Sequence, residues 1–190
     1  MSGSFPSTPA PSSIKVSSHQ PTLVSTSHSL KRQVRTRGVQ RWSFELQFPP
    51  MTRAEFAPIF AHVVKQQGQF GTFSFVPHTV GTSSGTVSGT VTADGGAAAG
   101  ATSVAITGLT GTLKAGDFVK FAGHAKVYML TADATTSLSI EPPLLSAVAS
   151  GEAVSYTDVP FTCALSADVN EYQTGAPAVY AFQVALIEVA

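Results

Sequence analysis

Two stretches of alternating apolar and polar residues are the strongest structural signals in this sequence. Near residue 45, four large apolar side chains alternate with polar ones and so share one face of an extended segment: Trp42, Phe44, Leu46 and Phe48. The same period of two returns near the end of the chain, at Phe161, Cys163 and Leu165 and then at Tyr180, Phe182, Val184 and Leu186. Each stretch is predicted to be a half-buried strand. Weaker alternation over residues 22–27 and 31–37 predicts two further strands joined by a turn.

A helix is predicted to begin directly after Pro49-Pro50. Thr52 and Glu55 have the spacing of a capping box, in which a hydroxyl and a carboxylate satisfy free backbone amides at the helix start. The apolar residues that follow recur with the period of one helix face: Phe56, Ile59, Phe60, Val63 and Val64. Gly68 stands where a left-handed residue commonly ends a helix. Pro58 is expected to bend or tighten the helix start without preventing the helix.

The middle of the chain has a different composition and predicts a second structural unit. Phe70, Phe73 and Phe75 predict a short strand that ends at Pro77, and from residue 79 to about residue 112 the chain is rich in Gly, Ala, Ser and Thr. Short strands separated by turn residues follow, predicted at 86–92, 103–107, 117–121, 126–131, 137–140 and 153–156. This spacing is typical of a small barrel or sandwich.

The predicted fold class is therefore mainly β, with a β-sandwich, one packed α-helix and an inserted small β-barrel-like domain. Residues 1–13 are rich in Ser and Pro and are expected to be a flexible leader. Residues 14–78 and 158–190 form the outer domain, because neither segment closes a core alone, and residues 79–157 form the insertion. Without the leader and the insertion, about 100 residues remain, a typical size for one domain. The residues predicted for the outer core all lie outside the insertion: Trp42, Phe44, Phe56, Phe60, Phe73, Phe75, Phe161, Phe182 and Val184.

The charge is low, balanced and unevenly distributed. Only 12% of the residues are charged, and 11 basic residues balance 11 acidic ones, which excludes attraction of the whole molecule to a polyanion and tolerates self-association. Residues 1–65 contain eight basic and two acidic residues, whereas residues 66–190 contain three and nine. Five of the basic residues lie within eleven positions: Lys31, Arg32, Arg35, Arg37 and Arg41. A solvated strand pair, a contact between subunits and, least favoured, a DNA contact all fit this cluster, which lacks interleaved aromatic residues.

No pattern predicts a catalytic, cofactor or metal site, and the protein is not expected to be an enzyme. The five histidines are scattered without metal-ligand spacing, and the single cysteine, Cys163, excludes an internal disulfide and is typical of a small buried residue. Asp117, Asp133 and Glu141 are candidates for an acid pair, but turn and strand-end carboxylates are more typical of such positions. No apolar run is long enough for a membrane helix. Residues 1–13 lack the features of a secretory signal, so synthesis in the cytoplasm without export is expected.

Several segments resemble the distal tail proteins and minor tail proteins of long-tailed bacteriophages. The resemblance rests on Val39-Gln-Arg-Trp-Ser-Phe-Glu-Leu-Gln-Phe-Pro-Pro, the helix through residues 56–67, and Gly68-Gln-Phe-Gly-Thr-Phe-Ser-Phe-Val-Pro. Residues 115–123, 124–133 and 140–144 are similar to the small β domain inserted in several such proteins. The resemblance covers roughly residues 22–190, and its motifs are structural rather than catalytic.

This resemblance implies a structural role in the virion tail tip, after synthesis in the host cytoplasm. The expected partners are copies of the chain itself in a ring, commonly a hexamer, together with the tail tube protein and the hub and fibre proteins of the baseplate. The basic cluster would then contact a neighbouring subunit or the tube, and nucleic acid is expected only as DNA that passes through the ring. The alternative is a carbohydrate-binding or adhesin module on a virion or cell surface, in which His124, Tyr128 or Tyr156 of the insertion contacts a glycan of the host.

Overall fold

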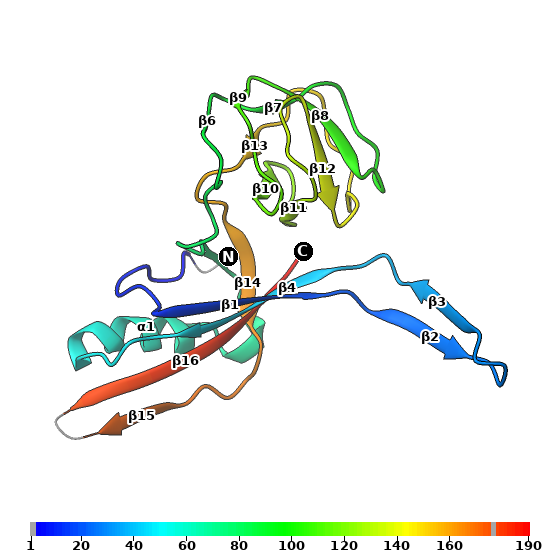
Figure 1. The fold of residues 1–190 in the computed structure, drawn as a ribbon. Coiled ribbons are helices and arrows are strands. Elements are labelled where there is room, and N and C mark those ends of the chain that lie inside the picture. Colours follow the sequence, from blue (N-terminus) through cyan, green and yellow to red (C-terminus); the bar gives the residue numbers. More distant parts are fainter. Residues whose placement is uncertain (1–2, 176–177) are drawn as a thin grey trace.

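The computed structural model describes residues 3–175 and 178–190 and confirms the predicted fold class, mainly β with one packed helix and an inserted barrel-like sheet (Figure 1). The outer part contains β1 (Ser13–His19), β2 (Thr22–Thr26), β3 (Arg32–Thr36), β4 (Arg41–Gln47), α1 (Arg53–Lys65), the 3-10 helix η1 (Gly68–Phe70), β5 (Phe73–Phe75), β14 (Phe161–Leu165), β15 (Tyr172–Gly175) and β16 (Val179–Glu188). The inserted part contains β6 (Val87–Ser88), β7 (Thr92–Ala93), β8 (Ser103–Thr107), β9 (Thr110–Gly111), β10 (Phe118–Phe121), β11 (Tyr128–Leu130), β12 (Ser137–Glu141) and β13 (Val154–Ser155).

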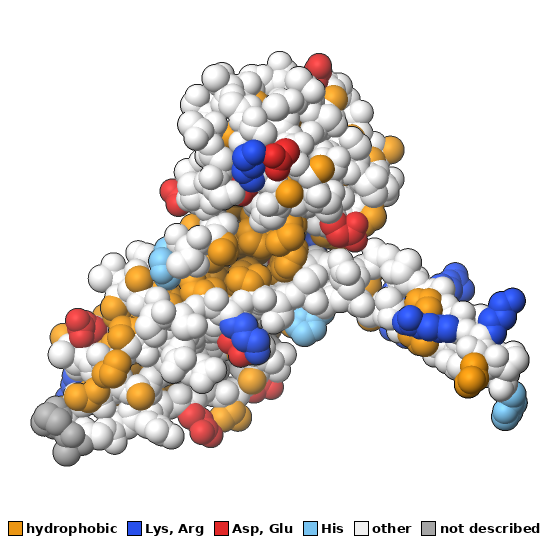
Figure 2. Space-filling model, viewed as in Figure 1, with side chains coloured by type: hydrophobic (Ala, Val, Ile, Leu, Met, Phe, Trp, Pro, Cys, Tyr) orange, Lys and Arg blue, Asp and Glu red, His pale blue; other side chains and the backbone are white. Residues whose placement is uncertain are grey.

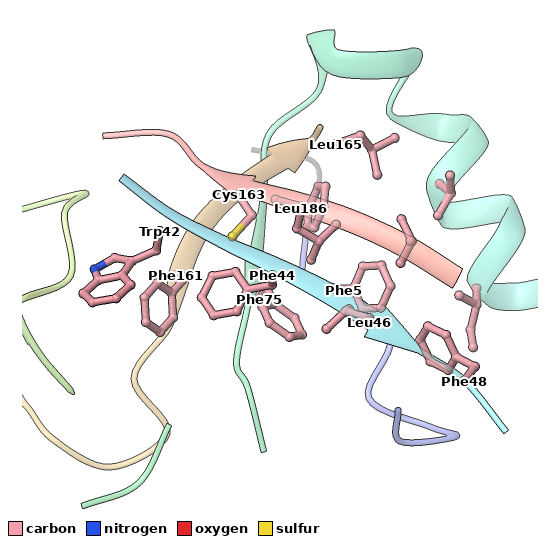
Figure 3. Close-up of a cluster of buried hydrophobic side chains, with 14 of the residues drawn as sticks. Phe5, Trp42, Phe44, Leu46, Phe48, Phe75, Phe161, Cys163, Leu165 and Leu186 are labelled. Carbon is pink, nitrogen blue, oxygen red and sulfur yellow. The ribbon is translucent and has the colours of Figure 1, made fainter. Parts of the chain in front are cut away.

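The outer part is built on one sheet with the strand order β1-β4-β16-β14-β5, in which every pair is antiparallel and β15 pairs with β16. The predicted alternation is present in β4, where Trp42, Phe44 and Leu46 are buried between partly or fully exposed neighbours. Their side chains join those of β14 and β16 on one side of the sheet, as Figure 3 shows. The hydrophobic core of the outer part therefore forms where the period-two strands of both chain segments meet.

The helix begins where the capping box predicts. The Glu55 carboxylate accepts hydrogen bonds from the Thr52 backbone amide (2.9 Å) and hydroxyl (2.8 Å), and the helix continues through Pro58. Gly68 has the predicted left-handed conformation, with φ of +68°, and Gln67 before it is also left-handed. A Cβ on Gly68 would lie 2.7 Å from the Asp168 carboxylate, so this position requires glycine. No helix in the described part of the chain is both long and apolar enough to cross a membrane.

The prediction of a flexible leader is wrong from residue 3 onward. Phe5 is buried, and its ring contacts those of Phe48, Phe73 and Phe75. The backbone beside it adds to the edge of β5, because the amide of Phe5 donates to Ser74 and the amide of Ser74 donates to Gly3. The Ser/Pro-rich composition does not predict this contact, because the segment has no periodic pattern. A single aromatic residue is enough to anchor it.

The inserted part forms a nearly closed barrel-like sheet with the order β13-β10-β11-β12-β8-β7. A bridge between Thr92 and Ala153 brings the two ends of this order together. The single strand predicted over 86–92 is instead two short strands, β6 and β7. Gly89, with φ of +105°, separates them, and a Cβ there would lie 2.2 Å from the Gly108 carbonyl oxygen. The insertion has a core of its own, which includes Leu113, Phe121, Leu138 and Ile140.

The outer core also includes residues of the insertion, in addition to those predicted from the sequence. Phe118 and Val127 are buried in the same cluster as Trp42 and Phe161. The ring of Phe118 lies 5.1 Å from that of Trp42 and 5.3 Å from that of Phe161, both edge to face. These two inserted residues complete the end of the outer core, so the two parts pack on each other through apolar side chains.

Candidate functional site

A two-stranded hairpin projects from the sheet, and every residue of its two strands is exposed. This hairpin, residues 22–37, is called the arm; it consists of β2, β3, their turn and Arg37, and it continues the line of β1 and β4 away from the body (Figure 1). Pro21 and Gly38 interrupt the pairing between body and arm: proline has no backbone donor, and Gly38 has φ of +68°. The arm therefore corresponds to the two strands predicted over 22–27 and 31–37.

Neither face of the arm is covered by another described part of the chain. All ten residues of β2 and β3 are exposed, although Leu23, Val24 and Val34 are apolar and each is 52% exposed. In the strand register Val24 lies opposite Val34, and Leu23 lies opposite Arg35 on the other face. A two-stranded hairpin alone is marginally stable in water. The arm thus has the properties of a surface that is buried in an assembly.

Four of the five residues of the basic cluster lie on the arm. Lys31, Arg32, Arg35 and Arg37 are exposed on it, and Figure 2 shows blue and orange side chains there. The ion pairs among the described residues are Lys15–Glu45, Lys114–Asp133 and Lys126–Glu188, and none of them includes an arm residue. The first acidic residue of the chain is Glu45. The arm is therefore a cationic projection without neutralisation inside its own chain.

Arg41, the fifth basic residue, belongs to a different environment. It is the first residue of β4, at the base of the arm. Burial is the main cause that lowers the pKa of the Lys126 amine, and the nearby charge of Arg41 lowers this pKa further. The sequence cluster therefore divides into an arm group of four and one residue beside the junction with the insertion.

That junction contains a buried charged pair that the sequence analysis missed. Lys126 of the insertion donates to Glu188 at the end of β16, and both side chains are buried. The same carboxylate accepts from the backbone amides of Trp42 (3.2 Å) and Val127 (2.9 Å). Burial lowers the pKa of Lys126, and the charge of Glu188 opposes this shift. One signal was available: Glu188 continues the inward alternation of Val184 and Leu186, where an apolar residue is normal.

Trp42 completes this junction. Its indole nitrogen donates to the carbonyl of Val127 at 3.0 Å, and the Lys126 amine lies 5.7 Å from the centre of its ring. The indole therefore contacts the insertion by a hydrogen bond, a cation–π contact and its packing on Phe118. The pair and the indole hold the two parts in one arrangement.

The end of the sheet opposite the arm carries acidic residues, whereas the arm is basic. β15 pairs with β16 along one side, and within the described residues no strand pairs with its other side. Val169 (72% exposed), Tyr172 (44%) and Val179 are exposed there, and the acidic residues Asp168 and Glu171 lie on either side of Val169 in the sequence. The Asp168 carboxylate accepts from the Gln69 amide at 3.1 Å. This end is referred to as the β15 edge, residues 168–175 with Val179.

Two hollows flank the β15 edge. The larger, of about 560 Å³, lies between α1 and the aromatic residues of β15 and β16, and its rim includes Arg53 and Lys65. The smaller, of about 330 Å³, lies between the end of β4 and β15 and is lined by Glu171, Tyr172 and three glutamines, Gln47, Gln173 and Gln183. The two hollows therefore differ in charge, one cationic and one anionic.

The candidate glycan contacts of the insertion lie mostly in its interior. Tyr128 is fully buried, and its hydroxyl is 2.8 Å from the Nδ1 atom of His124, which is also buried. Burial raises the pKa of Tyr128. Tyr156 is partly exposed and donates to the carbonyl of Gly89 at 2.8 Å. The structure does not bring these three side chains to one surface.

Two of the three carboxylates considered as an acid pair, Asp117 and Asp133, have structural partners. Asp117 accepts hydrogen bonds from the hydroxyls of Ser83 and Ser84 and from the backbone amides of Ser84 and Lys114. Partial burial would raise the pKa of Asp117, but these donors outweigh it and hold the pKa below its ordinary value. Asp133 pairs with Lys114 at 2.7 Å. Both carboxylates therefore organise loops of the insertion.

The remaining candidates for chemistry are separate from one another. Cys163 is buried in β14, and burial raises the pKa of its thiol. Among residues 3–175 and 178–190, no three His, Cys, Asp or Glu side chains come close enough together to hold a metal ion. Comparison with protein-family models and with curated proteins finds no match to this chain. The arm and the β15 edge are taken as the candidate site because both are exposed and carry apolar and charged side chains.

Proposed function

We propose that this protein is a structural component of a bacteriophage tail tip, a distal tail or baseplate hub ring that connects the tail tube to the hub and the host-recognition apparatus. The role is assembly rather than catalysis. The partners are copies of the chain itself, the tail tube protein and the hub or fibre proteins. The location is the tail tip of the virion.

The exposed arm carries this proposal. The arm presents three half-exposed aliphatic side chains and four cations. A hairpin of this kind gains little stability within a monomer, because water solvates its backbone and neither of its faces is packed. Burial against another chain removes that apolar area from water. The sequence resemblance to tail proteins indicates the kind of assembly, and the low overall charge of the chain permits close packing of identical subunits.

The test is the composition and mass of tail particles. Mass spectrometry of purified tails should detect the chain, an antibody against it should label the end of the tail far from the head, and its copy number should match a closed ring near six subunits. Absence of the chain from purified tails, or a strictly monomeric species both alone and within tails, contradicts the proposal.

Carbohydrate binding, the alternative function, has weaker support in the arrangement of its candidate residues. Two of the three aromatic or imidazole candidates, His124 and Tyr128, are buried and bonded to each other. Only Tyr156 presents part of its ring to solvent. Glycan sites usually need several exposed groups in one concave surface, so this alternative is not developed further.

A further inference from the structure

We infer that the arm of one copy docks into the anionic hollow beside β15 of the next copy of the same chain, with the Leu23–Arg35 face of the arm toward Glu171. The inference rests on the proposed function, because it names the contact by which copies associate. Its partner is a second copy of this chain rather than another tail protein.

The arm and the smaller hollow carry complementary charges. The arm group of four basic residues has no acidic neighbour in sequence before Glu45, whereas residues 158–190 contain four acidic residues and no basic one. Of those four, Glu188 is buried against Lys126, while Glu171 lines the smaller hollow. The larger hollow has Arg53 and Lys65 on its rim and would repel a cationic arm. The smaller hollow is therefore the receiving site.

One face of the arm fits this hollow better than the other. Alternation along β2 and β3 places Leu23, Ser25, Gln33 and Arg35 on one face, and Val24, Val34 and Arg32 on the opposite face. The first face combines an aliphatic side chain, a cation and two hydrogen-bonding groups. The hollow offers the Glu171 carboxylate and three amide side chains in return. Leu23 and Arg35 lie directly opposite each other in the register, so both reach the hollow together.

The placement of the two surfaces determines the type of assembly. The arm and the β15 edge lie at opposite ends of the outer part, as Figure 1 shows. A contact between them is heterologous, so each copy both donates an arm and receives one. Such contacts close into a ring when the rotation between copies allows it.

Disulfide trapping tests the contact directly. Two single variants, Leu23→Cys and Gln173→Cys, are purified and then mixed under oxidising conditions; native Cys163 is buried and does not react. We expect a covalent dimer in the mixture and none in either variant alone. Mixing Leu23→Cys with Ala98→Cys, an exposed position of the insertion, is the matched control and should give no dimer. A dimer of Leu23→Cys with itself would show an arm-to-arm contact and overturn the inference.

Charge exchange tests the predicted partners. Arg35→Glu and Glu171→Arg should each weaken self-association by at least about tenfold, because each leaves like charges together at the interface. The double variant Arg35→Glu/Glu171→Arg should restore association to near the wild-type value. Arg32→Glu makes the same charge change on the opposite face of the arm and should alter association by no more than about twofold. Sedimentation equilibrium of the full chain measures all four.

The outcomes separate this inference from the proposed function. Equal effects of Arg32→Glu and Arg35→Glu, or no rescue in the double variant, overturn the inference even if the chain forms rings in tails. A chain that stays monomeric at its highest soluble concentration and gives no mixed disulfide overturns it as well. Absence of the chain from tail particles, with the mixed disulfide and the rescue both present, contradicts the proposed function and leaves the inferred contact standing.

Discussion

Glu188 and Lys126 form a buried ion pair across the junction between the outer sheet and the insertion, although they are 62 positions apart in the sequence. The Glu188 carboxylate accepts hydrogen bonds from three donors, because the backbone amides of Trp42 and Val127 donate to it in addition to Lys126. The pair therefore couples the last strand of the sheet to a loop of the inserted barrel.

The two members of this pair should differ in their importance. Glu188→Leu leaves a buried cation and two buried amides without an acceptor, so we expect a loss of about 3–5 kcal/mol in the free energy of unfolding. Lys126→Met should cost less, because the carboxylate keeps its two amide donors. Urea denaturation monitored by tryptophan fluorescence compares the two variants. Equal costs would contradict the role given to the backbone amides.

Removal of the insertion tests how far the outer part depends on it. Replacing residues 79–157 by a short Gly/Ser linker uncovers Trp42 and Phe161 and removes the cation beside Glu188. We expect a chain that still unfolds cooperatively but with a clearly lower melting temperature than the full protein. The same deletion combined with Glu188→Gln should recover part of that loss, since it removes an unpaired buried charge. Calorimetry measures both, and absence of any cooperative transition would show that the outer sheet is not an independent unit.

The first residues of the described chain should contribute to stability. Phe5→Ala removes a buried ring from contact with Phe48, Phe73 and Phe75, and changes of this kind cost about 3–5 kcal/mol. Ser7→Ala, two positions later and exposed, is the control and should change stability by less than about 0.5 kcal/mol. Chemical denaturation is again the measurement. A neutral Phe5→Ala would mean that this segment does not complete the core.

Asp117 should make the stability of the chain sensitive to acid. Because its folded pKa lies below the unfolded value near 3.8, the carboxylate contributes stability that is fully present above that value and is lost as pH falls through the folded pKa. Asp117→Asn should therefore lower stability at neutral pH, by about 1–3 kcal/mol for the lost charged hydrogen bonds. The difference between variant and wild type should shrink below pH 4. A pH-independent difference would contradict the assignment.

Local patterns were sufficient for β4, β14, β16 and the helix of the outer part. The period of two at Trp42, Phe44 and Leu46 predicts their burial correctly, because a strand that packs one face on a core must place apolar residues at alternate positions. The Thr52–Glu55 spacing likewise predicts the start of α1, since a capping box is formed by residues that are three positions apart. The shift to Gly, Ala, Ser and Thr near residue 79 also separates the outer strands from the inserted ones.

The sequence by itself therefore determined the mainly β class, the helix and the position of the cationic cluster, whereas the tertiary structure decided which segments meet. The burial of Phe5, the pairing of Glu188 with Lys126 and the enclosure of His124 with Tyr128 all depend on contacts that no local period encodes. The arm is a further example. Alternation predicts its two strands, but only the fold shows that no other described part of the chain covers them. The physical reason is that periodicity reports whether a face is apolar, while the identity of its partner depends on the folding of distant segments onto each other.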